Sequence, residues 1–146
     1  MKTVSQILHA KGTVDVHTIS PAETVLEAIR RMAQKGIGAL VVREGDAIVG
    51  MVTERDYARK VILMGRNSDQ TAVREIMSPT VLYVRPQQSN EDCMALMASS
   101  RVRHLPVMDH GQLVGLISMG DLVKDIISDQ QFTIEQLEHY INGQHA

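Results

Sequence analysis

The sequence predicts an α/β fold of the α+β type, built from two copies of a β-α-β-β-α unit. Short β-branched runs alternate with stretches in which apolar residues recur every three or four positions, so strands and helices are interleaved. From Pro21 onward the chain repeats itself at a spacing of 65 residues. The spacing pairs Pro21 with Pro86, Met32 with Met97, Leu40 with Leu105, Val42 with Val107 and Asp56 with Asp121. This self-similarity indicates an internal duplication.

The composition is that of a globular chain from a reducing compartment. Of 146 residues, 44% are hydrophobic and 22% are charged, which argues against disorder. A net charge of −2 with no basic run disfavours nucleic acid as a partner. No apolar run reaches the roughly 18 residues of a membrane helix, and the chain has one cysteine. We therefore expect a soluble, cytoplasmic protein with no membrane or nucleic-acid partner.

Helices and short strands alternate in the first copy. Residues 3–9 have helical apolar spacing, and Gly12 is expected to end that helix. Ser20-Pro21-Ala22-Glu23 predicts the start of a second helix, which Gly36 ends. The brief strand expected between these helices contains Val14, Val16 and Ile19. The residues expected to be buried on the second helix are Val25, Ile29, Met32 and Ala33.

A hairpin and a third helix complete this copy. Apolar runs at 39–42 and 47–52 flank a polar, glycine-containing turn, which is the pattern of a β-hairpin. A helix is then expected from Thr53 to about Leu63. Its expected buried residues are Tyr57, Val61 and Met64.

We predict three segments from this pattern: repeat 1 over 1–66, repeat 2 over 67–130, and a C-terminal helix and tail over 131–146. A unit of about 55 residues is small to bury its own core. The two copies are therefore expected to pack sheet against sheet about a pseudo-twofold axis. In the tail, an apolar stripe on a short helix should dock on the body or on a second subunit. The stripe consists of Ile134, Leu137 and Ile141.

Each copy ends its last strand with the pattern Gly-x-x-Thr/Ser-x-x-Asp. The residues are Gly50, Thr53 and Asp56 in the first copy, and Gly115, Ser118 and Asp121 in the second. The hydroxyl and the carboxylate suit a helix capping box. They also suit a ligand site, because a helix N-terminus attracts phosphate and a carboxylate accepts ribose hydroxyls. A glycine inside an apolar strand costs β stability unless something approaches closely, which favours the ligand site. Both interpretations remain open.

The order and duplication of these elements resemble the CBS domain, and the pair resembles a Bateman module. The match also includes the openings Thr18-Ile19-Ser20-Pro21 and Tyr83-Val84-Arg85-Pro86 and the segment 101–107, and it covers essentially the whole chain. The resemblance implies a sensor that binds an adenosyl ligand in clefts between the two repeats. The ligands of the family are AMP, ADP, ATP, NAD(H) and S-adenosylmethionine. It also implies a homodimer and a regulated partner protein, as yet unknown, that responds to the ligand state.

The resemblance also implies roles for individual residues. Asp56 and Asp121 would hold ribose, while Thr53 and Ser118 would contact phosphate or ribose. Arg103 and His104 occur at their positions only in the second copy and would neutralise phosphate. The alternative is that Arg103 is a surface arginine and His104 a histidine satisfied by the protein. The other expected ligand-binding residues are Thr18, Ile37, Gly38, Ala39, Arg55, Tyr83 and Pro106.

Neither a metal site nor a catalytic constellation is expected. The six histidines form no pair at i, i+4, and none has a cysteine at ligand spacing. No nucleophile, metal set or acid–base pair supports an enzyme. Two hypotheses therefore stand beside each other: a stand-alone module that binds an adenine nucleotide, with AMP or NAD(H) favoured, and a ligand-independent dimerisation or protein-interaction module.

Overall fold

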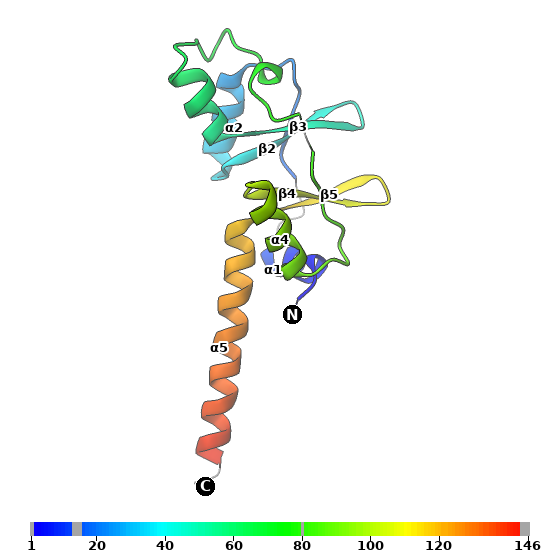
Figure 1. The fold of residues 1–146 in the computed structure, drawn as a ribbon, viewed down its shortest axis with the longest axis vertical. Helices are drawn as coiled ribbons and strands as arrows, with labels where there is room; N and C mark the ends of the chain where they lie inside the picture. Colours follow the sequence, from blue (N-terminus) through cyan, green and yellow to red (C-terminus); the bar gives the residue numbers. More distant parts are fainter. Residues whose placement is uncertain (1, 13–15, 80, 144–146) are drawn as a thin grey trace. The chain divides into compact units, whose positions relative to one another are not determined.

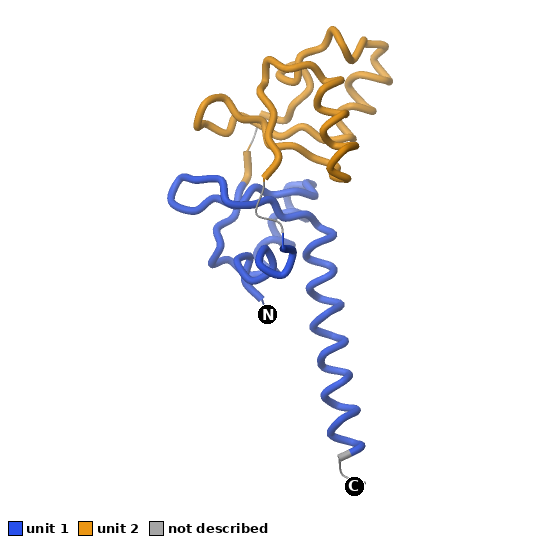
Figure 2. The backbone as a smooth tube through the Cα atoms, turned by 180° about the vertical axis from the view of Figure 1, so that it is seen from behind, with its two compact units in different colours: residues 1–14, 83–146 blue, residues 15–82 orange. Residues whose placement is uncertain are grey.

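The computed structural model describes residues 2–12, 16–79 and 81–143. The chain divides into two compact units. Unit 1 comprises residues 1–14 and 83–146, and unit 2 comprises residues 15–82 (Figure 2). Helices and strands are mixed in both units (Figure 1). The predicted fold class is therefore confirmed.

Unit 2 is a small mixed sheet with one main helix (Figure 1). Its strands are β1 (Thr18–Ile19), β2 (Ala39–Glu44) and β3 (Ala47–Thr53), with β1 parallel and β3 antiparallel to the central β2. Its helical segments are α2 (Val25–Lys35), α3 (Glu54–Tyr57), a π-helical turn η1 (Ala58–Ile62) and a 3-10 turn η2 (Val73–Glu75). The core side chains that α2 contributes are Val25, Ala28 and Met32, which pack with β2 and β3 residues such as Leu40 and Val52.

Unit 1 repeats this plan. Its strands β4 (His104–Asp109) and β5 (Gln112–Ser118) form an antiparallel pair, and Val84 bridges parallel to Val107 where unit 2 has β1. Its helices are α1 (Val4–Lys11), α4 (Asn90–Ser100) and the 25-residue α5 (Met119–Gly143).

The repeats exchange their equivalent N-terminal segments. The helix α1 opens repeat 1 in sequence, yet the backbone N–H of Val4 donates to the carbonyl of Gln88 in unit 1 at 2.8 Å. The turn η2 lies in the opening segment of repeat 2, yet the backbone N–H of Val73 donates to the carbonyl of Glu23 in unit 2 at 2.9 Å. The compact units therefore differ from the predicted segments 1–66, 67–130 and 131–146, because each opening segment packs with the other repeat.

Most predicted helix boundaries agree with the structure, and one start is wrong. The helix α1 ends at Gly12 and α2 ends at Gly36, both with left-handed backbone conformations. The helix α2 begins at the cap Thr24 rather than at Ser20-Pro21-Ala22-Glu23. Glu23 is engaged elsewhere, since its carboxylate accepts from the Ser20 backbone N–H at 2.9 Å.

Two burial predictions and one predicted helix are wrong. On α2, Ala28 is buried in place of Ala33, so the buried face is shifted toward Ala28. Met64 is 66% exposed, because the π-helical turn η1 adds a residue to the turn and rotates the following side chains away from the core. The predicted short terminal helix is instead the continuation of α5, since no glycine or proline interrupts 121–142. Val14, expected in the first strand, lies outside the described residues.

Candidate functional site

In unit 2, four predicted site residues lie together where β2 begins and β3 ends. We call Gly38, Ala39, Thr53 and Asp56 the first cap cluster. Ala39 and Thr53 are register partners across the two strands. The backbone N–H of Glu54 donates to the carbonyl of Gly38 at 3.1 Å. These backbone contacts bring the start of one strand against the start of α3.

The carboxylate of the first cap cluster is engaged through both of its oxygens. The backbone N–H and the hydroxyl of Thr53 donate to Asp56 Oδ2, at 3.0 and 3.1 Å. The Asp56 backbone N–H donates back to the Thr53 hydroxyl at 3.1 Å. Lys60 Nζ lies 3.3 Å from Asp56 Oδ1. The predicted capping box is therefore present.

Unit 1 contains the same arrangement with more charge. We call Arg103, His104, Ser118 and Asp121 the second cap cluster. His104 and Ser118 are register partners, and the backbone N–H of Met119 donates to the Arg103 carbonyl at 2.8 Å. Ser118 and Asp121 form the reciprocal cap, with N···O distances of 2.9 and 3.1 Å. The structure thus places Arg103 and His104 beside the capped start of α5.

Asp121 is paired with a lysine from the opposite end of the sequence. Lys11 Nζ, in α1, lies 3.0 Å from Asp121 Oδ2 and also donates to the Leu116 carbonyl at 3.1 Å. Burial disfavours ionisation of the Asp121 carboxyl, but the Ser118 backbone N–H and the Lys11 ammonium outweigh it, so the pKa is lowered. Asp121 is therefore ionised at neutral pH. A cavity of about 320 Å³ adjoins this pair between α1 and α5.

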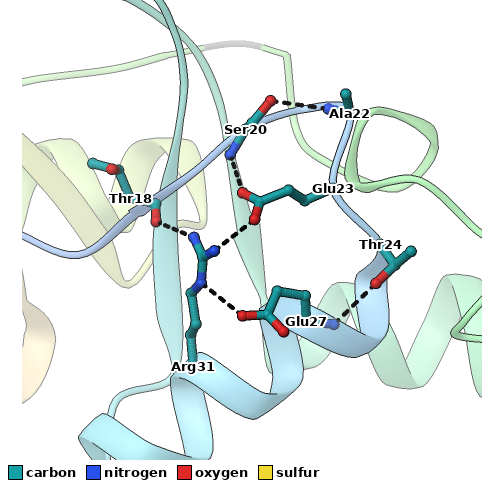
Figure 3. Close-up of polar contacts among 7 residues, drawn as sticks. All are labelled: Thr18, Ser20, Ala22, Glu23, Thr24, Glu27 and Arg31. Atoms are coloured by element: carbon teal, nitrogen blue, oxygen red, sulfur yellow. Dashed lines mark hydrogen bonds and ion pairs between the residues drawn. The ribbon is translucent and has the colours of Figure 1, made fainter.

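The strand residue Thr18 is held by an arginine clamp (Figure 3). Arg31 Nη1 donates to the Thr18 carbonyl at 3.0 Å. The same guanidinium pairs with the carboxylates of Glu23 and Glu27 (Figure 3). At the equivalent positions, 65 residues later, the chain has Gln88, Asp92 and Leu96, so this ionic clamp is a feature of unit 2.

The other predicted site residues are more scattered. Pro106 is buried as a register partner of Leu116, and Ile37 is half-buried against the unit 2 core. Tyr83 is 47% exposed, and Arg55 is exposed in the first turn of α3. Neither Arg55 nor Tyr83 is joined to its cap cluster by a hydrogen bond or ion pair among the described residues. Their roles stay predictions.

The strand glycines do not support a ligand site, contrary to the sequence argument. A Cβ at Gly50 would lie 2.6 Å from the Ser78 carbonyl oxygen and 2.9 Å from the Met77 sulfur. A Cβ at Gly115 would lie 2.7 Å from a Leu8 methyl carbon. The groups that approach these glycines closely are therefore the exchanged segments of the protein itself.

Sequence reasoning missed the two lysines that pair with the cap carboxylates. Lys60 stands four residues after Asp56 on the same helical stretch, a spacing that indicates such a pair. Lys11 is 110 residues from Asp121, and no local pattern connects them. Within the described part of the chain, no three His, Cys, Asp or Glu side chains gather as metal ligands would. None of the described helices has the length and apolarity to cross a bilayer.

Two successive repeats, each with a short sheet and a capped strand-to-helix turn, define a tandem-repeat module. The family model of the CBS domain matches residues 4–63 and 73–128. The chain belongs to the CBS domain family and carries two copies of the domain. CBS-domain proteins of this kind are regulatory and signal-transduction modules.

Relatives with the same paired arrangement occur in plants and bacteria. The mitochondrial CBS domain-containing protein CBSX3 of Arabidopsis thaliana is 35% identical over 97% of this chain and 72% of its own length. The CBS domain-containing protein YhcV of Bacillus subtilis is 39% identical over 81% of this chain and 84% of its own length. Among solved structures, a candidate signal-transduction protein with CBS domains from Burkholderia ambifaria is 57% identical, with a TM-score of 0.86. That match covers 91% of this chain and 99% of the other.

Proposed function

We propose that this chain senses an adenine nucleotide and passes the ligand state to a regulated partner protein. AMP and NAD(H) are the favoured ligands, with ADP and ATP as alternatives. The observation that carries the proposal is the second cap cluster. There a partly buried, ionised carboxylate, an arginine and a histidine adjoin the start of a 25-residue helix.

The chemistry of this cluster suits a nucleoside phosphate. The Asp121 carboxylate can accept hydrogen bonds from ribose hydroxyls. The positive end of the α5 dipole and the Arg103 guanidinium both favour a phosphate. The first cap cluster is poorer in charge, because Gly38 and Ala39 stand where the second has Arg103 and His104. We therefore expect the second cap cluster to bind phosphate more strongly.

Lys11 gives this proposal a mechanism for signalling. A ribose bound to Asp121 competes with Lys11 for the same carboxylate, and the adjoining cavity leaves the lysine side chain room to move. Ligand binding would then replace one of the contacts between α1 and α5. The bound and free proteins would differ in how firmly α1 is held, and a partner could distinguish the two states.

Calorimetric titration of the purified chain with AMP, ATP, NADH and S-adenosylmethionine tests the proposal. We expect saturable heat for AMP or NADH with dissociation constants in the range of about 1 μM to 1 mM. Mass spectrometry of small molecules released from the purified protein should identify the same ligand. Negligible heat for all four compounds, together with no released adenosyl compound, would contradict nucleotide sensing.

A second candidate is a ligand-independent interaction module. It is favoured by apolar side chains that α5 leaves exposed, among them Phe132, Ile134 and Leu137. The two candidates separate in one experiment, since binding of a partner should change with saturating nucleotide only if the chain is a sensor. The homodimer and the cytoplasmic location expected from the sequence stay predictions under both candidates.

A further inference from the structure

The C-terminal part of α5 lies beyond the contacts of its own unit. In Figure 1, this helix continues past α1, α4 and the β4–β5 hairpin, the other elements of unit 1. Its first turns are anchored, with Leu122 and Asp125 buried. Every described residue from Gln130 to Asn142 is exposed. A helix this long would normally place its apolar face against another element.

The exposed apolar residues of α5 follow a heptad repeat. Ile127, Ile134 and Ile141 are spaced by seven, and Val123, Gln130 and Leu137 form a second series with the same spacing. The two series alternate at intervals of four and three residues, as the a and d positions of a coiled coil do. We call these six residues the α5 seam. Its five apolar members are 42–57% exposed.

The side chains of the seam favour a second copy of the same helix. All three a positions are isoleucine, and one d position, Leu137, is leucine; isoleucine at a with leucine at d favours a parallel two-stranded coiled coil. In such a dimer each seam residue meets its own counterpart across the twofold axis. Gln130, the one polar member, would then face another amide, with which it can exchange hydrogen bonds. An unrelated apolar helix would leave that amide buried without a partner.

The flanks of the seam contain no charge pair that would oppose this dimer. The g positions are Ile126, Thr133 and Tyr140, all uncharged. The e positions are Lys124, Gln131 and Glu138. Because e faces g of the partner in a parallel coiled coil, no like charges meet there.

We propose that residues 123–141 form a parallel two-stranded coiled coil with a second copy of this chain. The seam is about 27 Å long at a rise of about 1.5 Å per residue. This is a short interface, so the dimer should form at micromolar rather than nanomolar concentration. The inference is independent of nucleotide binding, because none of the seam residues belongs to a cap cluster.

Sedimentation of the full chain over a range of concentrations tests the proposal. The double variant Ile134→Glu/Leu137→Glu places charges in two successive layers. It should weaken dimerisation by about 30-fold or more, which is roughly 2 kcal/mol. Phe132→Glu is the matched control, since Phe132 is 63% exposed on the same helix but occupies an f position, outside the seam. The control should dimerise like the original chain. Circular dichroism checks that both variants fold.

A cysteine variant tests the parallel register. In a parallel dimer, Gln130→Cys would place two thiols opposite each other at a d layer, so mild oxidation should give a covalent dimer. Cys93 is buried and should not contribute.

The proposal is wrong if the chain stays monomeric up to roughly 1 mM. It is also wrong if the seam variant and the Phe132→Glu control dimerise equally, or if Gln130→Cys fails to cross-link in a dimer.

Discussion

Asp121 is the residue on which the structure and the proposed function converge. Its carboxylate caps α5 through Ser118, pairs with Lys11 and is the group expected to hold ribose. A capped helix start can thus also be a ligand site, provided that the lysine gives way. Because Lys11 lowers the pKa of this carboxyl group, the contribution of the pair to stability can be measured through its pH dependence.

Replacing Lys11 should change the pH dependence of stability. The folded-state pKa of Asp121 lies below its ordinary value of about 3.9, so its ionised form stabilises the fold above that pH. This contribution is lost as the pH falls through the folded-state pKa. Lys11→Met should raise the pKa and lower the free energy of unfolding at neutral pH, by less than about 1 kcal/mol for a partly exposed pair.

Urea unfolding at neutral pH and at about pH 3 measures this difference. The gap between the original chain and Lys11→Met should shrink as the pH falls, because protonation of Asp121 removes the charge that Lys11 pairs with. A gap of the same size at both pH values would mean that Lys11 acts through packing rather than through Asp121.

Arg31 should matter more than other surface arginines. It joins the Thr18 carbonyl of β1 to two glutamates near the start of α2 (Figure 3). Arg31→Met should lower the free energy of unfolding by about 1–2 kcal/mol, because it removes several charged hydrogen bonds at once. The matched control is Arg43→Met, which removes only exposed local contacts, a pair with Asp46 and a hydrogen bond to the Gly45 carbonyl, and should cost less than about 0.5 kcal/mol. Equal losses by denaturant unfolding would refute the clamp.

Among the elements, the sequence predicts the strands and the helix ends better than the length of the long helix α5. The capping and C-terminal glycine signals are local, so Thr53, Ser118, Gly12 and Gly36 behave as predicted. The sequence predicts a separate helix after residue 130, instead of one continuous α5, because the repeated pattern stops there. A repeat in sequence reflects duplication, whereas the length of a helix depends on the absence of helix-breaking residues, and 121–142 contains no glycine or proline.

The two strand glycines should respond differently to a methyl group. An alanine Cβ at Gly50 would meet the backbone oxygen of Ser78 at 2.6 Å, and a backbone oxygen cannot move alone. At Gly115 the nearest atoms are the end of the flexible Leu8 side chain. We expect Gly50→Ala to cost about 2–3 kcal/mol and Gly115→Ala about 1 kcal/mol, measured by urea unfolding. The reverse order would contradict the packing described for these strands.

Across the whole molecule, the main feature that sequence did not predict is the exchange of opening segments. The repeat itself is visible as identities at a fixed spacing, and the cap clusters follow from it. The sequence does not show which repeat each opening segment packs against, because both repeats present nearly the same apolar surface. Leu8 lies against Gly115, and its counterpart Met77 lies against Gly50, so the choice depends on chain connections rather than on local pattern.

Removing the N-terminal segment should therefore loosen the unit that lies far from it in sequence. Deletion of residues 1–12 removes Val4 and Ile7, which are buried in unit 1. Hydrogen exchange should accelerate in β5 and the first turns of α5, while β3 keeps its protection. Faster exchange in β3 instead would show that the segment packs with its own repeat.

The most direct test of nucleotide sensing compares two aspartates that cap helices in the same way. Asp92 forms a reciprocal cap with Ser89, as Asp121 does with Ser118, but Asp92 belongs to neither cap cluster. Asp92→Asn and Asp121→Asn should therefore disturb their helix caps alike, while only Asp121→Asn also changes the pair with Lys11 and the proposed site. Calorimetry with the ligand found for the original chain should show unchanged affinity for Asp92→Asn. For Asp121→Asn it should show affinity lower by about tenfold or more, which is roughly 1.4 kcal/mol. Equal affinity for both variants would show that Asp121 is a helix cap and nothing more.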